Sequence, residues 1–231
     1  ALSGTAGNPD LDPYRADQID LGLEYYPDTG TGYAVAVFYK DVESFITDRP
    51  VIQNFNVQSA TAPSLDCTPV GPNTFDCPFT INLRSNGGGG EIKGVELAVT
   101  QPIMGGFGLQ ANYTYADAQA DNGDPLPQSS EDQFNFTGYY EDERLSARIA
   151  YSYRSDFFVT FDRTTPLNQD GFGTLDASVS YQLTDNVALT AEGVNLTNEE
   201  IVQYAGEKFR PRAIYDNGAI YFVGVRVGFN Q

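Results

Sequence analysis

The residues that could do acid–base or nucleophilic chemistry are few in type. The chain has 31 Asp and Glu, two Cys and no His. The absence of His excludes Ser-His-Asp triads, Cys-His dyads and His-ligated zinc. Glu96 and Glu192 could form an acid–base pair, but nothing near them in the sequence predicts a substrate cleft. We therefore interpret them as structural groups paired with Arg148, Arg154 or Arg226, and predict no catalytic residue, no cofactor and no enzymatic activity.

Both cysteines, Cys67 and Cys77, lie in one polar stretch, residues 47–85. Two Cys in an otherwise Cys-free chain predict a disulfide formed in an oxidising compartment, and two free thiols are the alternative. A Cys-only metal site needs more than two ligands, so no metal centre is predicted. The acidic segment 117–124 could hold Ca²⁺ through oxygen ligands. It lacks the spacing of an EF-hand and is interpreted as a solvated loop.

Charge and hydropathy exclude two further classes of protein. The chain has 231 residues and a formal net charge of −18. Such an acidic surface repels phosphate backbones, and no Lys/Arg cluster reverses this locally, so no nucleic-acid partner is predicted. No run of about 18 apolar residues is present, so no transmembrane helix is predicted. With 41% hydrophobic residues, the chain has the composition of a folded protein.

The dominant sequence period is two. In residues 175–183, Leu175, Ala177 and Val179 alternate with Asp176 and Ser178. Strict alternation places the two sets on opposite faces of a strand, so about nine antiparallel strands are predicted. The alternating segments are residues 19–25, 33–39, 95–99, 107–115, 134–140, 145–154, 175–183, 187–191 and 219–229. No segment has a helical period, and the chain is predicted to be all-β.

The connections between these segments are alternately short and long. Turns rich in Asp, Asn and Gly are predicted at residues 27–30, 104–106, 141–143 and 184–186. Long polar stretches cover residues 47–85, 118–130, 156–171 and 197–217. The glycine run 87–90 is interpreted as a flexible loop base or a bulge. Short turns at one end and long loops at the other are typical of outer-membrane β-barrels.

The polar members of the alternating segments are predicted to line a lumen. These residues are Asp20, Glu24, Glu96, Arg148, Arg154, Asp176, Glu192 and Arg226. The opposite face is a band of Leu, Val, Ala, Tyr and Phe that no second layer covers. Hydrocarbon would satisfy that band, and a closed barrel would satisfy the backbone. An antiparallel, up-and-down transmembrane β-barrel is therefore predicted, and a soluble one-sided β domain is the alternative.

Several strings in the chain resemble one family. They are Asn-Pro-Asp-Leu-Asp-Pro at residues 8–13, followed by residues 17–25, 90–97, 107–115, 192–198 and 221–229. In this order they resemble the barrel of TonB-dependent outer-membrane receptors. That barrel has about 22 strands and holds an N-terminal plug domain. The resemblance implies that residues 1–231 form a C-terminal segment of about nine strands, with the plug domain and signal peptide absent.

The resemblance also implies a function and partners. The intact receptor would lie in the outer membrane of a Gram-negative bacterium and take up a scarce ligand (a siderophore, a vitamin or an oligosaccharide) into the periplasm. Its partners would be outer-membrane lipid, its own plug domain, the small-molecule ligand and, through the plug, the TonB–ExbB–ExbD complex. A passive porin or an autotransporter-like barrel is the alternative.

Two loops are candidates for ligand contact. Phe161 and Arg163 combine an aromatic face with a guanidinium, which suits sugar rings or planar anionic chelates. The same reasoning covers Tyr204, Phe209 and Arg210 in the last long loop. The neighbouring pair Phe157 and Phe158 is interpreted as part of an outer aromatic girdle.

Overall fold

The computed structural model describes residues 2–123, 125–162 and 165–229, and every regular element in these ranges is a β-strand. The strands are β1 (Leu2–Ala6), β2 (Arg15–Tyr25), β3 (Gly32–Ser44), β4 (Ile46–Gln58), β5 (Thr68–Gly71), β6 (Thr74–Asn86), β7 (Gly90–Pro102), β8 (Phe107–Ala120), β9 (Asp132–Glu141), β10 (Leu145–Arg154), β11 (Phe157–Asp162), β12 (Thr165–Gln169), β13 (Phe172–Thr184), β14 (Val187–Val194), β15 (Ile201–Ala205), β16 (Pro211–Tyr215) and β17 (Ile220–Val227). A search of the described residues for a helix long and apolar enough to cross a membrane finds none.

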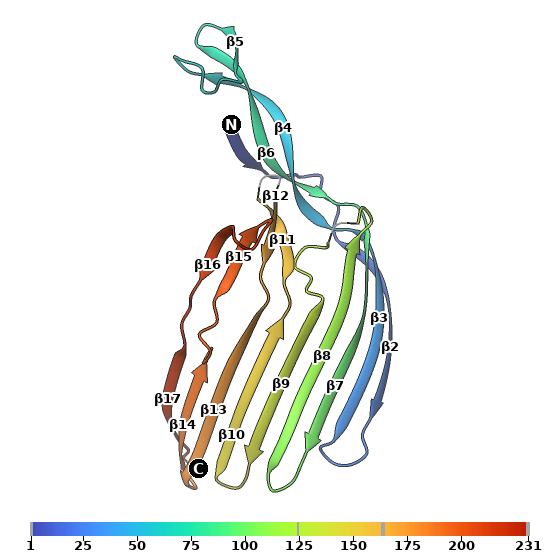
Figure 1. The fold of residues 1–231 in the computed structure, drawn as a ribbon, viewed down its shortest axis with the longest axis vertical. Helices are drawn as coiled ribbons and strands as arrows, with labels where there is room; N and C mark the ends of the chain where they lie inside the picture. Colours follow the sequence, from blue (N-terminus) through green and yellow to red (C-terminus); the bar gives the residue numbers. More distant parts are fainter. Residues whose placement is uncertain (1, 124, 163–164, 230–231) are drawn as a thin grey trace.

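Nine of the described strands form one sheet, in the order β17-β14-β13-β10-β9-β8-β7-β3-β2, and every pairing in it is antiparallel. Its strands are long and tilted, and the sheet is curved (Figure 1). Eight of these strands contain one of the nine alternating segments, and β17 covers most of the ninth, so the prediction of nine antiparallel strands is confirmed. The order follows the chain, with excursions at one end only, as an up-and-down barrel wall requires.

Short turns join these strands at one end of the sheet. Gly30, Gly105 and Gly106 have φ values of +90°, +62° and +85°. Residues other than Gly rarely adopt this backbone conformation. In the turn after β9, the Asp142 carboxylate accepts hydrogen bonds from the backbone N–H groups of Arg144 and Leu145, both at 2.8 Å. The predicted turn chemistry therefore closes the hairpins.

The longest connection was expected to be a polar loop and instead forms an arm. β4 and β6 pair along their whole lengths, and β5 pairs with the start of β6. The arm rises beyond the loop end of the nine-stranded sheet (Figure 1). β1 adds to β6 in parallel, with Leu2 opposite Phe79. This pairing departs from the antiparallel prediction. A parallel pair needs a long connection between its strands, and more than 60 residues separate β1 from β6.

The two last long connections also contain strands. β11, β12, β15 and β16 form a four-stranded antiparallel sheet at the loop end. Large apolar side chains on the nine-stranded sheet are exposed, with Leu21 at 71% and Val223 at 88%. The buried apolar side chains include Val42, Leu126 and Phe158, which lie at the loop end. The apolar face of the sheet therefore needs hydrocarbon against it, while the loops have a small core of their own.

Candidate functional site: a polar face and a loop-end cavity

The strand registers place the predicted lumen residues on one face. Glu96 lies opposite Thr114, Thr114 opposite Gln133, and Gln133 opposite Arg154. Arg148 lies opposite Ser178, which lies opposite Glu192. Directly opposite residues share a face, and so do residues two apart on a strand. The set that shares this face is Asp20, Glu24, Glu96, Arg148, Arg154, Asp176, Glu192 and Arg226. That this face borders a lumen stays a prediction.

The predicted pairing of Glu96 and Glu192 with arginines is absent from the part of the chain that the structure describes. The ion pairs found there join other residues. Ser178 stands between Arg148 and Glu192 in the register, so two strand spacings, about 10 Å, separate their backbones. The polar face therefore carries charges that are available to another surface.

The opposite face carries aromatic side chains near both ends of the strands. Near the turns, the rings of Tyr25 and Tyr33 stack at 6.4 Å. Toward the loops, Phe134 packs against Tyr151 and Tyr153 at 5.7 Å and 5.3 Å between ring centroids. An apolar band between two aromatic groups is the arrangement that a transmembrane barrel presents to lipid.

The loop end contains a cavity of about 420 Å³ lined by two aromatic rings of β11. Phe158 and Phe161 meet edge to face, with ring centroids 5.0 Å apart. A register shift between Phe158 and Thr160 places both rings on the same face, although they are three residues apart. Phe161, predicted from sequence as a ligand contact, thus lines a cavity of a size that holds small molecules. Contact with a ligand remains a prediction.

The cavity depends on close packing that sequence reasoning missed. The Phe45 ring lies so close to Gly87 that a side-chain carbon there would stand 2.7 Å from the ring. A carbon added at Gly89 would stand 2.7 Å from the Val42 carbonyl oxygen. Phe45, Gly87 and Gly89 all line the cavity. Because these glycines have no side chain, the Phe45 ring and the Val42 carbonyl can approach the backbone here. The glycine run 87–90 is the feature of the sequence that could have indicated this packing.

Arg154 of the polar face joins two loops below this cavity. Its Nε donates to Ser130 Oγ at 2.9 Å, and its Nη2 donates to the Gln128 carbonyl at 3.3 Å. Its guanidinium lies 4.1 Å from the centre of the Phe157 ring. Phe157 and Phe158 are both buried, so the interpretation of this pair as an outer girdle is wrong. The loops fold over these rings and remove them from the surface.

The second group of predicted contacts is outside the described lining of the cavity. Tyr204 is buried, with Lys208 Nζ 6.0 Å from its ring centre, whereas Phe209 is 80% exposed and Arg210 is exposed. Lys208 donates to Asp170 at 2.6 Å, and this hydrogen bond raises the pKa of Lys208. Tyr204, Phe209 and Arg210 are therefore not among the described residues that line the cavity with Phe161. Arg163, predicted beside Phe161, lies outside the described residues.

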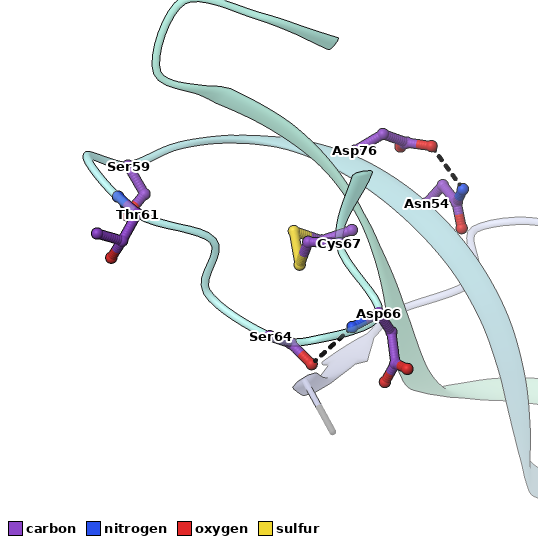
Figure 2. Close-up of a disulfide and its surroundings, with 8 residues drawn as sticks. Asn54, Ser59, Thr61, Ser64, Asp66, Cys67 and Asp76 are labelled. Carbon is purple, nitrogen blue, oxygen red and sulfur yellow. Dashed lines mark hydrogen bonds between the residues drawn. A yellow bond between two sulfur atoms is a disulfide. The ribbon is translucent and has the colours of Figure 1, made fainter. Parts of the chain in front are cut away.

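The arm carries the two cysteines, which the structure joins by a disulfide between Cys67 and Cys77. Figure 2 shows it beside the Asn54 amide, which donates to Asp76 at 2.7 Å. Both cysteines are buried. The bridge spans ten residues and closes the tip of the arm. In the ranges that the structure describes, no cluster of three or more Cys, Asp or Glu could hold a metal ion. Asp124, the last residue of the acidic segment considered for Ca²⁺, lies outside those ranges.

Comparison with known proteins finds one family. Residues 1–196 match the model of the TonB dependent receptor-like β-barrel. The Iron-regulated outer membrane virulence protein of Vibrio cholerae is 26% identical over 96% of this chain and 32% of its own length. The Vitamin B12 transporter BtuB of the same species is 24% identical over 91% of this chain and 38% of its own length.

Solved structures show the same fold. The siderophore receptor PirA from Acinetobacter baumannii superposes with a TM-score of 0.68 at 16% identity, over 97% of this chain and 33% of PirA. The copper transporter OprC gives 0.63 at 17% identity, over 96% of this chain and 33% of OprC. The chain spans about a third of the length of the curated relatives it matches. It belongs to the TonB-dependent receptor β-barrels, which are outer-membrane transport proteins and not enzymes.

Proposed function

We propose that this chain is the C-terminal part of the barrel of a receptor that uses TonB-derived energy to take a scarce small ligand into the periplasm. The observation that carries the proposal is the separation of the two sheet faces. One face presents apolar and aromatic side chains to lipid, and the other presents Glu96, Arg148 and Glu192 with no ion pair among them in the described residues.

The partners in this proposal follow from those faces. Unpaired charges across several strands suit a polar protein surface inside the barrel, and the plug domain of the same receptor is the partner proposed for it. That plug would in turn contact the TonB–ExbB–ExbD complex. The loop end, with its cavity at Phe158 and Phe161, would face the cell exterior and meet the ligand first. A siderophore, a vitamin or an oligosaccharide is the proposed cargo class.

Uptake measured with and without TonB tests this proposal. Cells that produce the full receptor containing this chain would be given labelled ferric siderophores, cobalamin, copper and oligosaccharides. At least one compound should accumulate in cells with TonB and stop accumulating when the tonB gene is deleted. The matched control is a strain that lacks the receptor.

The alternative is a passive porin or an autotransporter-like barrel. Accumulation that depends on the receptor but persists without TonB would overturn energised uptake and favour a passive pore. Absence of accumulation for every compound in both strains would overturn the proposed cargo class.

A further inference from the structure

The loop of residues 125–131 separates two cavities. Pro127 lines both the outer cavity of about 420 Å³ and a second one of about 430 Å³, and Phe45 forms another part of the shared wall. On the side of the second cavity, Leu126 is buried. The loop is held there by the hydrogen bond from Gln128 N–H to the Phe158 carbonyl at 2.7 Å and by Arg154.

The second cavity, called the inner cavity below, lies on the polar face of the sheet. Lys40, Val42 and Ile92 line it. Lys40 lies opposite Ile92, and both share a face with Phe38 and Asp20. The inner cavity therefore stands between the outer cavity and the face that we propose borders the lumen.

The charge of the inner cavity is opposite to that of the chain. The chain has 31 acidic and 13 basic residues, yet the described residues of the cavity wall include Arg15 and Lys40 and no acidic residue. Within the described residues, neither cation has a carboxylate within salt-bridge distance. Tyr14 and Ser129 add hydroxyl groups to the same wall. Two cations that converge on a half-enclosed space concentrate positive potential there, because low-dielectric walls focus the field.

We propose that the inner cavity is a second binding site, which holds an anionic group such as a carboxylate or phosphate. Arg15 would bind two oxygens of the anion through its planar guanidinium, and Lys40 would act as a point charge. Binding at the site does not depend on energised uptake. That the transported ligand occupies this site during uptake rests on the proposed function. A volume of about 430 Å³ is within the range that holds small ligands.

The electrostatic potential in the inner cavity can be measured from the rates at which a cysteine thiol in its wall reacts with charged reagents. The variant Ser129→Cys would be made in the full receptor, where Cys67 and Cys77 remain joined and leave no other free thiol in this chain. Its reaction rates with an anionic reagent (sulfonatoethyl methanethiosulfonate) and a cationic one (the trimethylammonium analogue) would then be compared. Adding Arg15→Gln and Lys40→Gln should lower the anionic-to-cationic rate ratio about tenfold.

Lys93→Gln is the matched control. Lys93 follows Ile92 of the inner cavity on β7 and therefore lies on the opposite face of the sheet. It pairs with Glu91 at 2.9 Å and with Asp117 at 3.4 Å. This substitution should leave the rate ratio unchanged. An equal ratio in all variants would overturn the positive potential of the inner cavity.

Protection by inorganic phosphate tests binding. Phosphate should slow the anionic reagent at Ser129→Cys more than sodium chloride of equal ionic strength does, and Arg15→Gln with Lys40→Gln should abolish the difference. Phosphate that protects no better than chloride would overturn the anion site while leaving TonB-dependent uptake, which is measured separately, untouched. Loss of uptake on tonB deletion together with intact protection would support both proposals.

Discussion

Arg154 donates a hydrogen bond from Nε to the buried hydroxyl of Ser130 at 2.9 Å, which joins the end of β10 to a loop residue 24 positions earlier in the chain. Ser130 Oγ in turn donates to the Ser155 carbonyl at 3.0 Å. One residue of the barrel wall thus helps to hold the loop that separates the two cavities, together with the bond from Gln128 N–H to the Phe158 carbonyl. The position of that loop is set by a side chain on the sheet rather than by the loop alone.

Removing this contact should release the loop. Arg154→Gln leaves the buried Ser130 without its charged donor, which costs about 1–3 kcal/mol. Amide exchange at Gln128, whose N–H is bonded to the Phe158 carbonyl, should accelerate by roughly tenfold or more. Arg148→Gln is the control, because Arg148 lies on the same face of β10 and its side chain makes no hydrogen bond or ion pair with the described residues. Similar exchange in the two variants would contradict the role of Arg154.

The face assignment makes a separate prediction. Val179 lies opposite Ala147 and Ala191 on the apolar face, whereas Ser178 lies opposite Arg148 and Glu192. Val179→Arg should impair membrane assembly, because a cation at mid-bilayer on the lipid face costs about 2–4 kcal/mol. Ser178→Arg should be tolerated. Heat-modifiable mobility on unboiled gels measures assembly, and equal loss in both variants would show that the faces are wrongly assigned.

The nine wall strands could be predicted from sequence because each has one apolar face and one polar face, and a slip of one residue would invert both. The arm was missed because its strands carry polar residues on long stretches, although Phe75, Cys77, Phe79 and Ile81 alternate in β6. Its parallel partner β1 is more than 70 residues away, and local pattern says nothing about such a pairing.

The cavity could be predicted only in part. Phe161 was found from its aromatic character, but Phe45 and Gly87 lie at the two ends of the arm, and Phe158 lies in a different connection, in β11. The register shift in β11 also places Phe158 and Phe161 on the same face of the strand, although they are three residues apart. A bulge of this kind leaves no periodic signal in a six-residue strand.

The disulfide predicts a local effect of reduction. Non-reducing peptide mapping of the folded protein should find Cys67 linked to Cys77. In the loop-closure model, a bridge across ten residues constrains the unfolded tip by about 3 kcal/mol. Cys67→Ser with Cys77→Ser should therefore speed proteolysis of the arm and leave the heat-modifiable mobility of the barrel unchanged. Alkylation of both thiols in unreduced, oxidatively folded protein would contradict this pairing.

The outer cavity predicts an effect on ligand affinity. Once an uptake assay has identified a cargo compound, Phe161→Ala should weaken its binding by roughly three- to tenfold, because one aromatic contact is worth about 0.5–1.5 kcal/mol. Phe55→Ala is the control, since Phe55 also makes an edge-to-face pair, with Phe79 at 5.4 Å, but does so in the arm. Surface abundance should be equal in all strains. Unchanged affinity in Phe161→Ala would place the ligand contacts elsewhere in the receptor.

Asp142 predicts a pH-dependent contribution from a hairpin turn. Its carboxylate accepts hydrogen bonds from the Tyr140 hydroxyl at 2.7 Å and from the backbone N–H groups of Arg144 and Leu145, and these bonds lower the pKa of Asp142. A lowered folded-state pKa stabilises the folded protein above the ordinary pKa of about 4, and that stabilisation is lost as pH falls through the folded value. Asp142→Asn should therefore lower the free energy of unfolding in urea at neutral pH, and the difference from the unsubstituted protein should shrink at about pH 2. Asp185→Asn, in the turn after β13, is the control for replacing a turn carboxylate, because the Asp185 side chain has no hydrogen-bond partner among the described residues. A difference for Asp142→Asn that is the same at both pH values would mean that the turn depends on the shape of the side chain and not on its charge.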